Sequence, residues 1–185
     1  MNKVICHFNL VAKHKWYVFK NCCRAGIPLQ GLLHDLSKFS PTEFFESAKY
    51  YTGDRSPIDN CKDDKGVSYA WMHHKGRNPH HWEYWVDEVG SENPVGRKMP
   101  YKYAVEMICD YIGAGQAYQG KNWTPAGQLE WWKEKRKHVR MHPDILAFVD
   151  TCMFWLSISG EKTILTPEIL KSYWRCAGID VNYLH

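Results

Sequence analysis

The sequence predicts an all-α fold, and three of its features lead to this expectation. A capping residue followed by proline, which is typical of a helix start, recurs at Ser40-Pro41, Asn78-Pro79, Thr124-Pro125 and Thr166-Pro167. No comparable run alternates apolar with polar residues, as a half-buried strand would. With 44% hydrophobic and 24% charged residues over 185 positions, the composition is that of one globular domain.

Turn-forming residues divide the first half of the chain. Gly26 is placed to end the first helix, and Pro28 can begin the second. The capping box at 40–43 begins the third helix. The polar stretch 52–65, rich in glycine, proline and aspartate, predicts a loop. We therefore expect helices over residues 3–25, 28–38, 41–51, 67–74 and 79–88.

The second half begins with a predicted loop over 89–99, which carries glycine and proline. The next segment, 101–118, has nonpolar stripes on most sides and predicts a buried helix. The Thr-Pro pairs begin two of the later helices. We expect helices over residues 101–118, 125–141, 143–158 and 167–177. No repeat or linker divides the chain, so a single domain over 1–185 is predicted.

The net charge limits which kinds of partner the protein is expected to bind, and the cysteine content indicates its cellular compartment. The 24 Lys and Arg residues exceed the 20 Asp and Glu residues only slightly, so nucleic acid and anionic membranes are not the expected partners. Seven cysteines without a CxxC pair argue against a disulfide framework or a zinc ribbon. The longest apolar tract, 145–158, contains Asp150 and is too short to span a bilayer. We expect a cytoplasmic protein with no membrane segment.

Two histidines and two aspartates lie at positions that suit a metal site. His34 and Asp35 end the apolar stretch 29–33, on a helix that we expect to be buried. His14 lies on the inward stripe of the first helix, and Asp110 lies in the buried segment. A buried carboxylate needs a partner, which a metal ion or a basic side chain would supply. Taken singly, each residue also fits a structural role as a helix cap, an ion pair or a core residue.

Four histidines lie within nine residues, across a helix end, a turn and a helix start: His73, His74, His80 and His81. Such a turn can direct imidazoles from both flanks toward one point, and neutral imidazole is a common ligand of transition metals. In the first turn of the helix predicted over 79–88, the dipole would keep His80 and His81 neutral. Chance clustering at the surface is the other explanation.

These residues, taken in order, resemble a known pattern. His14, the string HDLSK at 34–38, the cluster at 73–81 and Asp110 resemble the H...HD...H...D signature of the HD-domain superfamily of metal-dependent phosphohydrolases. The strings HDLSKFSPTEF, HHKGRNPHHWEYW and EMICDYIGAGQAY look like a family of short, uncharacterised bacterial and phage proteins related to that superfamily. The resemblance covers about residues 10–120. It implies a single compact helical bundle of the HD type, with 121–185 as additional C-terminal helices.

The resemblance also implies a site for one or two divalent transition-metal ions, which could be Mn, Fe, Co, Ni or Zn. The core ligands that it implies are His14, His34, Asp35 and Asp110. Members that bind two metals supply two further histidines. Here we expect His74 and His81, with His73 and His80 as alternatives or as hydrogen-bonding residues behind the ligands.

The activity that the resemblance implies is hydrolysis of a small phosphate ester. Asp35 would orient the attacking water or bridge two metals, and Lys38 matches the lysine beside the phosphate site. Glu106 can hydrogen-bond a ligand histidine. The residues expected to contact substrate are Lys38, Arg77, Tyr118 and Lys121. A nucleotide is one expected substrate, because aromatic side chains near these motifs could stack on a base: Trp71, Trp82, Trp85, Tyr111 and Tyr118.

Two other functions and one assembly state stay open. The HD scaffold also carries diiron oxygenases with six ligands, and the histidine-rich turn could supply the extra two. A basic run, 133–142, suggests a noncatalytic module that binds nucleic acid or another partner, although a solvated helix face explains it as well. The neighbouring Trp131 and Trp132, with Phe154 and Trp155, could form a homodimer contact.

Overall fold

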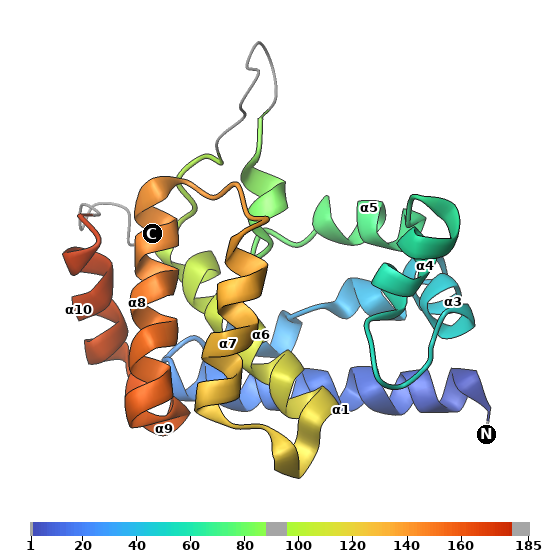
Figure 1. Ribbon diagram of the computed structural model, residues 1–185, viewed down its shortest axis with the longest axis horizontal. Coiled ribbons are helices and arrows are strands. Elements are labelled where there is room, and N and C mark those ends of the chain that lie inside the picture. The colour runs from blue at the N-terminus through green and yellow to red at the C-terminus, as the bar shows by residue number, and fades with distance from the viewer. Residues whose placement is uncertain (1, 88–95, 179–185) are drawn as a thin grey trace.

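The computed structural model describes residues 2–87 and 96–178, and in these residues the prediction of an all-α fold is confirmed (Figure 1). The one β-bridge among them joins Val86 to Gly96. The helices are α1 (Lys3–Arg24), α2 (Pro28–Leu33), α3 (Pro41–Lys49), α4 (Pro57–Lys65), α5 (Tyr69–Lys75), α6 (Tyr101–Gln119), α7 (Pro125–Arg136), α8 (Pro143–Ser159), α9 (Glu161–Ile164) and α10 (Pro167–Cys176). Short 3-10 helices are η1 (Leu36–Phe39), η2 (Trp82–Trp85) and η3 (Gly120–Asn122).

In Figure 1 the long helix α1 runs along the lower edge of the molecule, with one group of helices over each of its halves. α2 and α3 pack against α1, and α4 and α5 pack on α3. On the other side, α7 and α10 pack against α8. α6 contacts both α1 and α8, so it is the element that connects the two groups.

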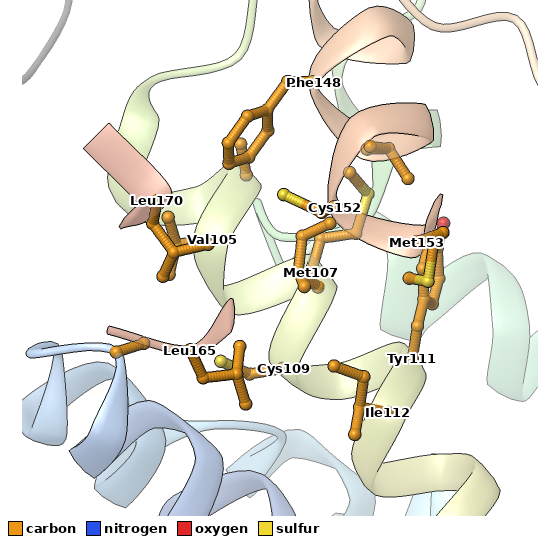
Figure 2. Close-up of a cluster of buried hydrophobic side chains, with 14 of the residues drawn as sticks. Val105, Met107, Cys109, Tyr111, Ile112, Phe148, Cys152, Met153, Leu165 and Leu170 are labelled. Atoms are coloured by element: carbon orange, nitrogen blue, oxygen red, sulfur yellow. The ribbon is translucent and has the colours of Figure 1, made fainter. Parts of the chain in front are cut away.

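The hydrophobic core lies between α6 and the C-terminal helices (Figure 2). Full burial of one large apolar side chain contributes about 1.5–3 kcal/mol relative to exposure. The core side chains labelled there are Val105, Met107, Cys109, Tyr111, Ile112, Phe148, Cys152, Met153, Leu165 and Leu170. Val18 and Cys22 of α1 belong to the same cluster. One core therefore joins the segment before residue 120 to the segment after it.

α1 and α6 cross closely at Gly113, where a side chain would not fit. A Cβ at this position would lie 2.6 Å from Val18 Cγ2 and 3.1 Å from the Val18 backbone nitrogen. One turn further along, Lys13 Nζ donates to the Ala117 carbonyl at 2.7 Å. The absent side chain thus sets the spacing of the two helices.

The prediction of a loop over 52–65 is wrong for most of this stretch, because residues 57–65 form helix α4. Pro57 occupies its first turn, Cys61 is buried beneath it, and Gly66, with φ 73°, ends it. Its residues are mostly polar, and its buried residues are Pro57 and Cys61. A helix with so narrow an apolar face shows little hydrophobic periodicity in its sequence.

The helix predicted over 28–38 ends at Leu33, and the expectation that it is buried is wrong. His34, with ψ 128°, ends the helix, Asp35 then adopts a left-handed backbone conformation, and η1 follows. Within α2, Gly31 is the buried residue: a Cβ there would lie 2.6 Å from Cys22 Cβ. The flanking leucines consequently point outward, and Leu29 is 61% exposed.

Two more predicted helices differ from the structure. The helix expected over 79–88 is the 3-10 helix η2, and residues 88–95 of this region and of the adjoining loop lie outside the described residues. The helix expected over 125–141 ends at Arg136. The seven cysteines are all free thiols. None of the described helices is both long and apolar enough to cross a membrane.

Candidate metal centre

Four side chains that lie far apart in the sequence meet one turn from the α1–α6 crossing. His14 comes from α1, His34 and Asp35 from the turn between α2 and η1, and Asp110 from α6. His14 Nε2 lies 3.2 Å from Asp110 Oδ1, and His34 Nε2 lies 3.2 Å from Asp35 Oδ2. All four are buried, and their ligand atoms lie within 4.8 Å of one another. We name these four residues the first donor group.

A second donor group, consisting of Asp35, His74, His80 and His81, faces the other oxygen of the same aspartate. His74 and His80 each place Nε2 3.3 Å from Asp35 Oδ1. His81 Nε2 lies 2.8 Å from His74 Nε2. Two imidazole nitrogens this close need a shared proton or a common cation between them. Asp35 therefore presents one oxygen to each group.

The backbone at Asp35 makes this shared position attainable. Its φ of 53° is left-handed, and no other non-glycine residue in the described ranges has a positive φ. Aspartate tolerates this conformation better than most residues, and such strain is common at functional sites. Lys15 Nζ supports the turn by donating to the carbonyls of Leu32 and His34, each at 2.7 Å. The turn directs the Asp35 carboxylate into the cluster.

Two buried glutamates orient the imidazoles by accepting hydrogen bonds from their Nδ1 atoms. Glu106 Oε1 lies 3.0 Å from His34 Nδ1 and 3.1 Å from His80 Nδ1. Glu43 Oε2 lies 2.7 Å from His74 Nδ1. When Nδ1–H is donated to a carboxylate, the Nε2 lone pair is free to bind a metal, as in many metal sites of proteins. The expectation for Glu106 agrees with this geometry.

The protein alone does not satisfy the buried polar atoms of the cluster. Asp35 Oδ2 is ion-paired with Lys38 Nζ at 2.6 Å, but neither Asp35 oxygen forms a hydrogen bond among the described residues. His80 Nε2 is also buried and forms no hydrogen bond among the described residues, although it lies 3.3 Å from Asp35 Oδ1. Buried polar atoms that lack hydrogen bonds are costly. Divalent cations would satisfy these atoms, and the mixed nitrogen and oxygen donors suit transition metals.

The pKa values of the first donor group favour charged carboxylates. Burial would raise the pKa of Asp110, but His14 and His34 hold it well below its usual range. Burial lowers the pKa of His34, yet the carboxylates around it, Asp35 foremost, hold it well above its usual range. A metal that binds these imidazoles must therefore displace protons.

The prediction that His80 and His81 lie in the first turn of a helix is wrong. Both precede η2, and His81 is its N-cap residue, so no α-helix dipole acts on them. Burial, His80 and His74 hold the pKa of His81 well below its usual range. The pKa of His80 is raised, because the carboxylates around it outweigh burial. The neutral form expected for both is thus favoured only for His81.

A pocket of about 640 Å³ opens over the cluster and is lined by ligands of both donor groups. Of the residues predicted to contact substrate, Lys38 and Tyr118 line it. Arg77 and Lys121 are not among its lining residues, so their expected contact with substrate stays a prediction. Arg77 follows the C-terminal end of α5, Lys121 lies in η3 beyond the end of α6, and both are exposed.

Comparison with known proteins assigns the chain to a family. The sequence profile of one family matches residues 3–153, which is more than half of the chain. The chain belongs to the DUF5662 family, a family of unknown function. The matched part of this DUF5662 protein contains every candidate ligand, from His14 to Asp110. No curated protein and no solved structure matches the chain significantly.

The glutamate that supports the second donor group in this DUF5662 protein is one that the sequence did not identify. Glu43 forms the predicted cap, because its backbone nitrogen donates to Ser40 Oγ at 3.4 Å. Its side chain instead accepts from His74 and from His73, the latter at 2.6 Å. His73 therefore lies behind the ligands and joins neither group. Local spacing does not carry this signal, because the contact joins α3 to α5.

The aromatic residues expected near the site of the DUF5662 protein separate into two sets. Trp71 and Tyr111 line the pocket, as Tyr118 does. Trp82 and Trp85 pack against the hydrophobic core instead. Further lining comes from side chains that the sequence did not indicate for this role: Lys62, Glu83, Trp131 and Lys135. Burial raises the pKa of Glu83.

Proposed function

We propose that this DUF5662 protein is a metal-dependent phosphohydrolase, as its resemblance to the HD-domain superfamily implies. One observation carries the proposal. The buried Asp35, which has no hydrogen-bond partner among the described residues, offers one oxygen to each of two donor groups beneath a pocket. Lys38 lines the same pocket beside Asp35, where a phosphoryl oxygen would need a positive charge. Such a site needs no nucleophilic serine or cysteine.

Some residues of the site would hold metal ions, and others would hold the substrate. The first donor group would bind one divalent ion and the second donor group a second ion, with Asp35 common to both. When bound, such an ion supplies Lewis-acid chemistry, since it polarises a phosphoryl oxygen and lowers the pKa of coordinated water. Glu43 and Glu106 keep the imidazoles oriented, and Lys38 binds a nonbridging oxygen of the phosphate. The substrate is a small phosphate ester that fits the pocket.

Elemental analysis of protein purified without an affinity histidine tag tests the proposal. We expect about one or two equivalents of Mn, Fe, Co, Ni or Zn per chain, and loss of metal in folded Asp35→Ala and Asp110→Ala variants. The metal-loaded protein should release phosphate from members of a nucleotide and phosphodiester panel, and Asp35→Ala should not. The control is Asp63→Ala, because Asp63 is an exposed aspartate paired with Arg55. A protein that stays metal-free after reconstitution with all five metals would refute the proposal.

A second candidate function is that of an HD-type diiron oxygenase. The observation that favours it is the second donor group, whose imidazoles can complete a six-ligand set. Iron with a visible charge-transfer band and no phosphate release would select this function. Lys38 beside Asp35 favours hydrolysis, because a phosphate accounts for a lysine at that place.

The alternative of a nucleic-acid or partner-binding module loses the support of its basic run. Three cations of 133–142 are paired with acidic neighbours: Lys133 with Glu130 at 2.7 Å, Lys137 with Glu134 at 2.6 Å, and Arg136 with Asp150 at 2.9 Å. Their charge is thereby largely balanced along the surface. Salt-sensitive binding of DNA or RNA that survives Asp35→Ala would restore this alternative.

The assembly state and the compartment stay predictions. Phe154 and Trp155 are exposed, as a homodimer contact requires, but Trp131 lines the pocket. Trp132 is 1% exposed and donates from Nε1 to Asp150 Oδ1 at 2.8 Å, so it cannot contact a partner. A homodimer would therefore use α8, and sedimentation at several concentrations tests it. A cytoplasmic location is proposed from the free thiols.

A further inference from the structure

One stripe of α1 carries exposed apolar side chains where a surface helix usually carries polar ones. Its members, Ile5, Phe8 and Trp16, lie on one side of the helix at helical spacing. The next segment, α2 with η1, exposes a second apolar row, which consists of Leu29, Leu32, Leu33, Leu36 and Phe39. Single exposed apolar residues are normal, but a continuous apolar patch marks an interaction surface.

The two rows lie side by side. A Cβ at Gly31 of α2 would lie 3.0 Å from Phe19 Cα, near the C-terminal end of α1. Nearer the other end of α1, the rings of Phe8 and Phe39 lie 6.1 Å apart, measured between centroids. α2 and η1 therefore run antiparallel to α1, and the two rows form one surface. We name it the α1–α2 face.

The excess positive charge of the chain is concentrated in the segment that forms this face. Residues 2–42 contain six lysines and arginines and one acidic residue, the buried Asp35. Lys38 pairs with Asp35, which leaves five cations without an acidic residue of the segment to balance them. The rest of the chain has slightly more acidic than basic residues. The mild net charge of the whole chain, which argued against an anionic partner, conceals this local excess.

An apolar face within a cationic segment suits an anionic lipid surface. Apolar side chains can enter between the headgroups, while lysines extend along apolar surface and place their charge beside the lipid phosphates. Trp16 fits this arrangement, because tryptophan is enriched at membrane interfaces, and Lys20 Nζ lies 5.6 Å from its ring centroid. α1 also runs along one edge of the molecule, where a flat surface can approach it (Figure 1).

A second copy of the chain suits the face less well. A symmetric contact would place the same cations of both copies against one another, and such like charges repel. An acidic protein partner would need an apolar face of its own with carboxylates at its border. The lipid surface needs only the charge and the apolar area that the described residues already provide.

We propose that the α1–α2 face binds peripherally to anionic lipid bilayers. α1 would lie in the plane of the bilayer surface and would not cross it, in agreement with the lengths and composition of the described helices. This property goes beyond the proposed hydrolysis, because it needs neither a metal ion nor a substrate. A failure of one proposal therefore leaves the other unaffected.

Sedimentation with vesicles in the presence of a chelator tests the proposal. The probes are phosphatidylcholine vesicles with or without about 30% phosphatidylglycerol. We expect wild-type protein to bind the anionic vesicles at least about tenfold more tightly than the neutral ones, because the lysines near the surface add their contributions. Raising the salt concentration should weaken this binding.

One pair of double variants tests the apolar part of the face. Phe8→Gln/Leu29→Gln should weaken binding to the anionic vesicles at least about tenfold, because apolar area no longer enters the bilayer. The matched control is Phe154→Gln/Ile158→Gln on α8, which should bind as the wild type does. Leu29 and Ile158 are both 61% exposed, and Phe8 and Phe154 are 49% and 51% exposed.

A second pair tests the charge at constant net charge of the chain. Lys3→Glu/Lys20→Glu should abolish the preference for anionic over neutral vesicles. The control is Lys162→Glu/Lys171→Glu, on α9 and α10, which should keep it. Urea denaturation checks that all four variants are folded, since exposed substitutions should change the free energy of unfolding little.

Three results would overturn the proposal. The first is wild-type protein that stays in the supernatant with anionic vesicles, and the second is a folded variant of either α1–α2 pair that binds as the wild type does. The third is a concentration-dependent dimer that Phe8→Gln/Leu29→Gln abolishes, because it would assign the face to a second copy. A monomer that binds no vesicles would instead point to an acidic protein partner.

Discussion

Two glutamates hold imidazoles of the two donor groups, and each glutamate contacts a pair of histidines. Glu106 accepts from His34 and His80, so it supports one ligand of each group. Glu43 accepts from His74 and from His73, so it supports the second group alone. The two carboxylates should therefore differ in which metal positions they control.

Substituting each glutamate by glutamine separates these roles. Glu43→Gln should weaken the second metal position by about 10- to 100-fold and leave the first unchanged, whereas Glu106→Gln should weaken both. The amide keeps the size of the side chain but lacks the charge that stabilises the donating Nδ1–H. Competitive metal titration against a chromophoric chelator measures both positions. Equal losses in the two variants would contradict the assignment.

His7 gives the metal-free protein a dependence on pH. Its side chain is 6% exposed, and its ring packs 5.2 Å from that of Phe44 and 5.9 Å from that of Tyr51. Burial, with a smaller effect from Lys38, lowers its pKa from 6.5 to about 4. Between these values the unfolded chain binds a proton that the folded chain does not. Stability therefore decreases as the pH falls from 6.5 to 4.

Replacing His7 by phenylalanine should remove this component. The aromatic packing is kept. Between pH 7.5 and pH 4.5, the free energy of unfolding of the variant should rise by about 1–2 kcal/mol relative to that of wild type. This range is reduced for partial solvent screening. Urea denaturation at both pH values in a chelator measures it. Parallel pH profiles for the two proteins would show that His7 does not contribute.

The α1–α6 crossing is the feature of the elements on which the metal centre most depends. Gly113→Ala should destabilise the protein by about 1–3 kcal/mol, because the added methyl group meets both the side chain and the backbone of Val18. It should also weaken metal binding, since His14 and Asp110 lie one turn away on the separated helices. Urea denaturation and metal titration measure the two effects. Val18→Ala in the same chain should restore part of the stability and would restore none if packing at Val18 were not the cause.

Several helix starts were predictable because their signals are local, although Asn78-Pro79 begins no α-helix and the start of α4 at Pro57 was missed. Ser40 and Thr124 cap α3 and α7 as the sequence indicates, with prolines in the first turn. Helix ends and short helices were less predictable. The left-handed turn at Asp35 and the burial of Pro57 and Cys61 in α4 depend on packing against distant segments. The exposure of the α2 leucines follows from the same dependence, because Gly31 rather than a leucine faces α1.

At the scale of the whole molecule, the order of histidines and aspartates in the sequence anticipated which residues the fold brings together. His14 and Asp110 were selected by their inward positions, and both lie in the first donor group. Partners across elements carried no such signal. Glu43 reaches α5 from α3, and His80 was ranked behind His81, although its Nε2 faces Asp35 directly. Each of these contacts depends on how separate helices are arranged.

One face of α6 lies toward the metal centre and another toward the hydrophobic core, and this limits how short a functional fragment of the protein can be. Glu106 and Asp110 project toward the donor groups, while Ile108 and Ile112 on other faces belong to the core shared with α8. Residues beyond Gln119 supply none of the identified donor atoms, yet they form the surface against which α6 folds. A fragment trimmed to its ligands would keep every donor atom and lose the scaffold that positions them. The C-terminal helices supply no identified donor atom, but the positions of the donor atoms on α6 depend on them.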